Sequence, residues 1–303
     1  MANSDFVENI RRTLLYYEIF DHPLTLEELF YLFPRNSLTK SEFTDRLRTL
    51  TADGSLSLFD GYYTLPSLPP GSVELREKRE KLAARRLKMA RFMSQIIRRF
   101  PFVRGVFLSG DLSKGVAHEQ SDIDYVIVTK SRRLWVCRSL LVLFKKIFLL
   151  NSRKYFCLNY FVAEDHLLLE DRNYYTATEI AHLKPLYNIE MFIRYMNANS
   201  WIKGFFPNYK VFALSDNETG GRNSFIRSVL EIPFMWGWID SLDSLLMKMM
   251  KRVWEKRYPH YDATTREKLF RCTPTESCAY VGNFSDKILG FYRDKLDRNN
   301  LKL

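Results

Sequence analysis

The feature that most constrains this chain is a central segment in which two apolar runs flank a turn of small residues and a pair of carboxylates. Val103–Leu108 and Tyr125–Val128 are predicted to be strands, because short apolar runs bounded by turn residues are typical of buried strands. Between them lie the turn 109–111, with the sequence Ser-Gly-Asp, and the acids Asp122 and Asp124. A tight turn and two acids therefore stand beside predicted strands.

The pair of aspartates carries the strongest chemical signal. Alternate residues of a strand point to the same face, so Asp122 and Asp124 are expected to project together, about 6.6 Å apart at the backbone, with Ile123 in the core. Two like charges this close repel unless a cation lies between them, and hard oxygen ligands suit Mg²⁺. Because the turn at Gly110 can bring backbone N–H groups up to a phosphate, the pattern predicts nucleotide chemistry.

Composition supports a globular protein with an anionic partner. The chain has 303 residues, enough for two or three domains, and is 46% hydrophobic and 15% aromatic. Its formal net charge of +11 favours a nucleotide, a nucleic acid or an acidic surface as the partner.

Cysteine usage and the N-terminal sequence indicate a cytoplasmic protein. The cysteines show no metal-type spacing and the N-terminus lacks a signal-peptide pattern, so we expect reduced thiols. The longest apolar stretch, Leu134–Leu150, is interrupted by cations and is predicted to be a helix packed on a sheet. We therefore expect no membrane partner.

Residues 1–70 are predicted to form a winged-helix-like domain. Apolar residues at helical spacing predict a first helix, and capping-box sequences at Thr25 and Thr39 each begin another. Asp60-Gly61 between two short apolar runs predicts a hairpin. Three helices and a hairpin are similar to a winged helix, in which the third helix would read DNA. That helix carries both cations and acids here, so DNA binding and a scaffold role remain open.

A long basic helix and a small mixed sheet are predicted for residues 71–173. The stretch Arg76–Arg99 holds ten Lys/Arg and two acids. It is either a solvated helix face or an electrostatic track for a nucleic acid or for triphosphates. The helix Leu134–Leu150 is followed by a further predicted strand, Tyr155–Ala163.

Residues 174–303 are predicted to be an all-helical region. The helical ranges are 178–199, 224–257, 264–270 and 283–298. The predicted fold class is therefore α+β and multidomain, with a winged-helix-like N-terminal domain, a central small mixed-sheet domain and an all-helical C-terminal region.

The central motif resembles the nucleotidyltransferase superfamily of DNA polymerase beta and the minimal nucleotidyltransferases. The family pattern is an apolar residue, Gly, Gly or Ser, a short loop, and then Asp, an apolar residue, and Asp or Glu. Leu108–Asp111 begins this pattern and Ser121–Tyr125 completes it, and the resemblance covers residues 80–165. It implies that residues 71–173 form a nucleotidyltransferase domain, which transfers a nucleoside monophosphate from a nucleoside triphosphate.

The resemblance also implies a set of site residues. Asp122 and Asp124 would hold Mg²⁺, with Mn²⁺ as the alternative, and Gly110 would let the backbone approach the phosphates. Asn159 takes the catalytic position that a third carboxylate occupies in active members. The other nucleotide-binding residues that the resemblance implies are Ser109, Asp111, Ser113, Lys114 and Ser121.

Two residues depart from the family pattern. Asp111 stands where Gly or Ser is usual, and it adds negative charge beside a triphosphate. Asn159 can coordinate Mg²⁺ through its carbonyl oxygen but cannot accept a proton from a nucleophile. Glu164 is expected on the opposite face of the strand from Asn159, and Asp165 is expected about 20 Å along it, so neither replaces the missing acid.

Two main functions remain open at this point, beside a third possibility, a protein-interaction partner in a two-gene system whose nucleotidyltransferase domain modifies or neutralises a companion. The first is a Mg²⁺-dependent nucleotidyltransferase with an unidentified hydroxyl acceptor. The alternative is a catalytically degenerate nucleotide-binding protein that acts as a winged-helix DNA-binding or regulatory module. The sequence carries no signal for the oligomeric state.

Overall fold

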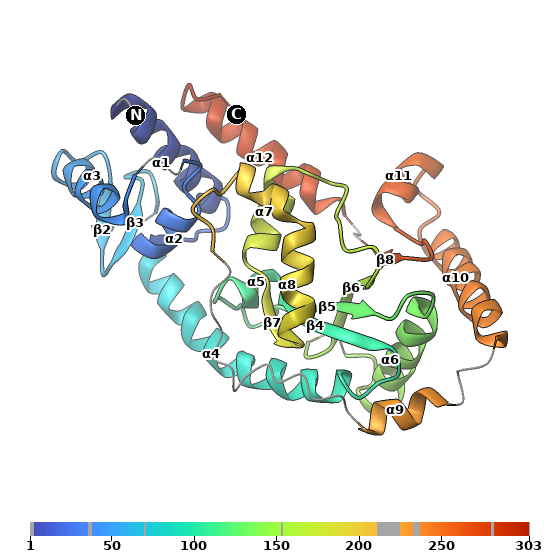
Figure 1. Cartoon of the computed structure of the whole chain (residues 1–303). Coiled ribbons are helices and arrows are strands. Elements are labelled where there is room, and N and C mark those ends of the chain that lie inside the picture. The colour runs from blue at the N-terminus through green and yellow to red at the C-terminus, as the bar shows by residue number, and fades with distance from the viewer. Residues whose placement is uncertain are drawn as a thin grey trace.

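The computed structural model describes residues 3–35, 38–69, 71–152, 154–210, 225–232, 237–279 and 282–302, and it has an α+β fold with two separate sheets (Figure 1). The elements, in chain order, are α1 (Asn3–Glu18), β1 (Leu24–Thr25), α2 (Leu26–Tyr31), α3 (Lys40–Ala52), β2 (Ser57–Phe59), β3 (Tyr62–Thr64), α4 (Ser72–Ile97), β4 (Val103–Ser109), α5 (Gly110–Ser113), β5 (Asp124–Thr129), α6 (Leu134–Phe148), β6 (Cys157–Ala163), α7 (Tyr174–Ala181), β7 (Lys184–Tyr187), α8 (Ile189–Ala198), the 3-10 helix η1 (Ser200–Gly204), α9 (Phe225–Glu231), α10 (Trp238–Arg257), α11 (Ala263–Leu269), β8 (Glu276–Cys278) and α12 (Phe284–Arg298).

The N-terminal unit consists of three helices and a three-stranded antiparallel sheet with the order β1-β3-β2. Thr25 and Thr39 cap α2 and α3 with the capping boxes that the sequence predicts. Asp60 and Gly61 both have positive φ, 49° and 84°, as a tight two-residue hairpin turn requires. The three helices and the hairpin predicted for this region are therefore confirmed.

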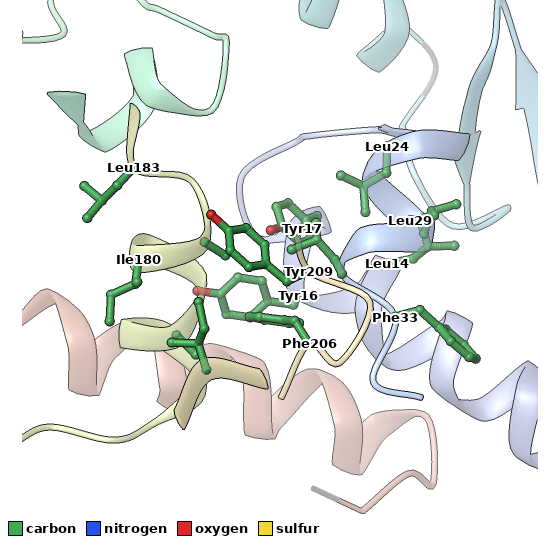
Figure 2. Close-up of a cluster of buried hydrophobic side chains, with 14 of the residues drawn as sticks. Leu14, Tyr16, Tyr17, Leu24, Leu29, Phe33, Ile180, Leu183, Phe206 and Tyr209 are labelled. Carbon is green, nitrogen blue, oxygen red and sulfur yellow. The ribbon is translucent and has the colours of Figure 1, made fainter. Parts of the chain in front are cut away.

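The N-terminal unit does not have a core of its own, because its apolar side chains join those of later elements. Leu14, Leu24 and Leu29 belong to the same hydrophobic cluster as Ile180 on α7 and Phe206 after η1. Figure 2 shows these side chains converging from the N-terminal helices and from the segments around α7. Burial of this shared surface fixes the N-terminal unit against the rest of the fold.

The central sheet has the strand order β7-β4-β5-β6-β8, and β5 and β6 are its parallel pair. Strands β4, β5 and β6 lie where the sequence predicts them. Their side chains alternate between two cores: Phe107 and Val126 face the α8 side, whereas Val106, Leu108 and Ile127 face the α4 and α6 side. The strands are buried on both faces, which explains why they are continuous apolar runs in the sequence.

The prediction of an all-helical C-terminal region is wrong. Strand β7 pairs with β4 at one edge of the central sheet, and β8 pairs with β6 at the other edge. Because β7 contains a proline and β8 has only three residues, neither shows the alternation or the apolar run that predicts a strand. The predicted helix 178–199 is consequently divided into α7, β7 and α8.

The predicted long helix 224–257 corresponds to α9 and α10, and its residues 224 and 233–236 lie outside the described residues. Among the described helices, none combines the length and the apolar character needed to span a bilayer.

Several cations of the basic stretch 76–99 act inside the fold. The Arg76 guanidinium donates to Glu28 at 2.8 Å, to Glu80 at 2.7 Å and to the Pro23 carbonyl at 2.8 Å. Arg86 donates to the carbonyl oxygens of the loop residues Glu119 and Ser121. Helix α4 therefore joins the N-terminal unit to the loop that precedes Asp122, and only part of its positive charge faces solvent.

His22 makes the stability of this junction depend on pH. Burial, and next the charge of Arg76, hold the pKa of His22 well below its ordinary value, so the ring is neutral in the fold. An unfolded histidine takes up a proton below about pH 6.5, so the stability due to the neutral ring is present above that pH and is lost below it.

We predict that His22 lowers the free energy of unfolding by up to about 1.4 kcal/mol for each pH unit below that pH, measured by urea unfolding above and below it. A His22→Gln variant keeps an acceptor for Arg76 and should lose less over the same interval; an equal loss would contradict the assignment.

Candidate functional site

Asp124 and Gly110 are held together where three strands of the central sheet meet. Asp124 is the first residue of β5, and it is the register partner of Ser109 on β4 and of Cys157 on β6. Gly110 follows β4 with a φ of 70°, and a Cβ atom there would lie 2.6 Å from Oδ2 of Asp124. Only glycine allows this backbone conformation together with this close approach to a carboxylate.

A cavity of 380 Å³ opens beside this contact, within the size range of small-ligand sites. Its walls come from three parts of the chain. The strand ends contribute Ser109, Gly110, Asp124 and Asn159, helix α7 contributes Tyr175, Thr176 and Glu179, and the C-terminal elements contribute Lys268, Arg271, Glu276 and Asp286.

The Asp124 carboxylate lies in an environment that disfavours its negative charge. Burial raises its pKa to about 6, against the opposing effect of a hydrogen bond from the Cys157 thiol. The charges of Asp122, Asp111 and Glu179 raise it further. Carboxylates from one loop (Asp122), strand β5 (Asp124) and the helices α5 and α7 (Asp111 and Glu179) thus act on the same carboxyl group, and a bound cation is the usual means of relieving such repulsion.

Asp122 does not share a strand with Asp124, contrary to the prediction. Strand β5 begins at Asp124, so Asp122 lies in the preceding loop and is not among the residues that line the cavity. Ile123 is fully buried, as expected; its N–H donates to the Lys154 carbonyl before β6, and its carbonyl accepts from the N–H of Cys157, the first residue of β6. The alternation argument therefore holds for Ile123, while Asp122 affects Asp124 through its charge.

The other residues around the glycine turn brace it from outside the cavity. The Ser113 hydroxyl donates to the Gly110 carbonyl at 2.7 Å, and the Ser121 hydroxyl donates to Asp111 at 3.2 Å. Lys114 forms an ion pair of 2.6 Å with Glu179 on α7. Of the predicted nucleotide-binding residues, the structure therefore brings Ser109 and Gly110 to the cavity wall, and these four others stand behind it.

Asn159 lies at an irregularity of β6. Leu158 pairs with Tyr125 and Tyr160 pairs with Val126, so Asn159 is an extra residue between two paired positions. Bulges of this kind redirect a side chain and are frequent beside active sites. Asn159 lines the cavity with Asp124, whereas Glu164 and Asp165 are not among the cavity-lining residues.

Sequence reasoning missed the acids and cations on the far side of the cavity. Arg271 binds Glu276 at 2.9 Å, and the Tyr160 hydroxyl donates to Glu276 at 2.8 Å. Lys268 pairs with Asp286 at 2.6 Å. These residues reach the cavity through the unexpected strand β8 and the neighbouring helices, so no local spacing in the sequence marks them.

The described residues around the cavity do not form a complete metal site by themselves. Among the residues that the structure describes, no group of three or more His, Cys, Asp or Glu side chains is arranged to hold a metal alone. Mg²⁺ is commonly held by one or two carboxylates, with phosphate oxygens and waters as the other ligands, and of the two predicted ligands only Asp124 lines the cavity. The buried Ser109 hydroxyl, at the same wall, has no hydrogen-bond partner among the described residues and is available to a ligand.

Comparison with known proteins returned no family model, no curated protein and no solved structure that matches this chain. The interpretation of the site therefore rests on its own geometry.

The contact between Gly110 and Asp124 predicts the effect of adding one methyl group. Gly110→Ala must displace the Asp124 carboxylate or the turn, and we expect it to lower the free energy of unfolding by on the order of 1–3 kcal/mol, measured by urea unfolding. Gly115→Ala is the matched control, because Gly115 has a similar φ of 79° with nothing within 4 Å. It should cost only about 1 kcal/mol. Combining Gly110→Ala with Asp124→Ala should restore part of the loss; equal effects of the two alanines, or strict additivity, would contradict the contact.

Proposed function

We propose that this protein is a Mg²⁺-dependent nucleotidyltransferase that moves a nucleoside monophosphate from a nucleoside triphosphate to a hydroxyl acceptor. The observation that carries the proposal is the Asp124 carboxylate, which faces a ligand-sized cavity against Gly110 with other carboxylates around it. The sequence pattern of a strand, a glycine turn and an Asp-apolar-Asp segment supports the same reaction.

The proposed reaction breaks one phosphoanhydride bond. The acceptor oxygen bonds to the α-phosphorus, the bond from that phosphorus to the β-phosphate oxygen breaks, and pyrophosphate leaves with the electron pair. The hydroxyl proton passes to a base or to water. Mg²⁺ held by Asp122 and Asp124 would neutralise the triphosphate and the leaving group, and Mn²⁺ is the alternative ion.

The chain's own residues have distinct roles in this proposal. Gly110 exposes the backbone to the phosphates, and Ser109 offers its hydroxyl from the cavity wall. Asn159 would offer its amide oxygen to the metal, but it cannot act as the base that accepts the proton of the acceptor hydroxyl. The acceptor would bind in the part of the cavity that lies between α7 and the charged residues Arg271 and Glu276.

A second candidate function, nucleotide binding without transfer, is favoured by Asn159, because the cavity wall on β6 has an amide where the family has an acid. In this case the protein would act as a regulatory module. The order of α1 to β3 resembles a winged helix, but in α3 Lys40 pairs with Glu27 at 2.5 Å and Arg48 with Asp45 at 3.2 Å. We therefore propose a scaffold role for this unit in preference to DNA reading.

The exposed cations of the basic helix α4 make a nucleic acid one of the proposed hydroxyl acceptors. Lys78, Lys81, Arg85 and Lys88 are exposed on α4. They recur at intervals of three and four residues and so share one face of the helix. A nucleic acid on this face would bind with strong salt dependence.

Removal of either metal-binding carboxylate tests the reaction. We expect Asp122→Ala and Asp124→Ala to lower the rate of label transfer from an α-labelled nucleoside triphosphate by about 100-fold or more in the presence of Mg²⁺. Asp165→Ala is the control, because Asp165 is exposed and does not line the cavity. If wild-type turnover is no greater than that of the Asp122→Ala/Asp124→Ala double variant while nucleotide still binds to wild type, the second candidate function replaces the first.

Restoring an acid at position 159 tests the role of the amide. Asn159→Asp adds a fourth negative charge near Asp124, so the variant should have a lower melting temperature than wild type without Mg²⁺. Mg²⁺ should raise the melting temperature of the variant by more than it raises that of wild type, because the added carboxylate is a further ligand. Asn159→Ala is the control for loss of the amide; an equal Mg²⁺ effect in all three proteins would show that position 159 does not face the metal.

A further inference from the structure

The C-terminal half of α6 and the turn after it carry large apolar side chains that the fold leaves in water. Leu143, Ile147, Phe148 and Leu150 are 53%, 59%, 68% and 89% exposed. A single exposed apolar residue is ordinary, whereas a cluster on one helix end indicates an interaction surface. These four residues are called the α6 cluster below.

An open apolar groove of 580 Å³ lies between the end of α4, helix α6 and α9. Its lining residues are Ile96, Arg99, Phe100, Pro101, Leu140 and Leu230. Phe144 connects the groove to the α6 cluster, since its ring lies 5.3 Å from that of Phe100 and 5.0 Å from that of Phe148. The groove and the cluster thus form one continuous apolar surface on the side of the molecule where Figure 1 shows α4, α6 and α9 meeting.

The backbone presents Leu150 to solvent at a conformational cost. Leu150 has a φ of 47° in the turn that ends α6, a position where glycine or asparagine is usual. A bulky residue rarely adopts this conformation. Because the Leu150 side chain has no burial within the chain to offset this cost, we infer that it serves a contact outside the chain.

The segments of α4 and α6 that form this surface, with the turns after them, contain no carboxylate. Residues 81–110 and 125–163 have no Asp or Glu, while two lysines near the α6 cluster in sequence are exposed: Lys146 on α6 itself, and Lys154 four residues after Leu150. Glu231, from α9, is ion-paired with Arg104 at 2.9 Å. Exposed apolar anchors with neighbouring lysines are a combination that binds anionic lipid headgroups and the acyl boundary beneath them.

We propose that this surface docks peripherally on an anionic lipid bilayer, with Phe148 and Leu150 as apolar anchors and Lys146 and Lys154 as headgroup contacts. Charge complementarity selects this occupant. A second copy would bring two cationic faces together, and a nucleic acid would leave the apolar anchors in water. Such docking needs no membrane-spanning helix and is independent of the chemistry at Asp124. It departs from the expectation of no membrane partner, which rested on the lack of a spanning segment.

Vesicle co-sedimentation of the full chain tests the proposal. Wild type should bind vesicles of phosphatidylcholine mixed with phosphatidylglycerol, bind phosphatidylcholine alone more weakly, and be released by salt. The double variant Phe148→Ser/Leu150→Ser should bind the mixed vesicles on the order of tenfold or more weakly. Lys146→Glu/Lys154→Glu should lose the preference for the anionic lipid. All four side chains are exposed, so these variants are expected to fold.

The matched control is Leu58→Ser/Phe59→Ser, which removes a leucine and a phenylalanine that are also exposed, on the hairpin strand β2. It should leave vesicle binding unchanged. The proposal is overturned if wild type binds neither kind of vesicle, or if the control weakens binding as much as the α6 variant does. It is also overturned if sedimentation shows self-association of wild type that Phe148→Ser/Leu150→Ser abolishes, because the occupant would then be a second copy.

Discussion

The close approach between the partly buried Asp124 carboxylate and the backbone of Gly110 is the constraint on which the site depends. A carboxylate at the junction of β4, β5 and β6 is costly to bury, and the charges of Asp122, Asp111 and Glu179 increase that cost. Asp124 lies at the wall of a cavity. In the proposed function, a cation and a charged ligand bound there would offset the cost of this negative charge. The same close approach favours glycine at position 110, so the turn and the acid are coupled in the structure.

Helix α4 and the N-terminal unit hold this arrangement in place from behind. Arg86 binds the carbonyl oxygens of Glu119 and Ser121, and so it fixes the loop that carries Asp122. Arg76 ties the same helix to α2 through Glu28. The positive charge of residues 76–99 suggests an external partner, but Arg76 and Arg86 from this stretch bond within the chain. The basic character of the sequence alone cannot separate these two uses, because both need cations on one helix.

Local signals in the sequence predicted the parts of the fold that are determined locally. The capping boxes at Thr25 and Thr39, the Asp60-Gly61 hairpin and the buried strands β4 to β6 each follow from short-range patterns. The edge strands β7 and β8 and the far wall of the cavity could not be predicted, because they are stabilised by pairing with strands distant in the chain. Glu179 reaches Asp124 only through the packing of α7, so nothing in its own sequence context marks it.

The central claim is that Asp124 holds a metal ion jointly with a nucleoside triphosphate. Calorimetric titration of a nucleoside triphosphate, with and without Mg²⁺, into wild type and into the isosteric Asp124→Asn variant tests it most directly. The account predicts that wild type binds only when Mg²⁺ is present, and that the variant gains no affinity from Mg²⁺. Binding by wild type that is independent of Mg²⁺, or an undiminished Mg²⁺ effect in the variant, would contradict it.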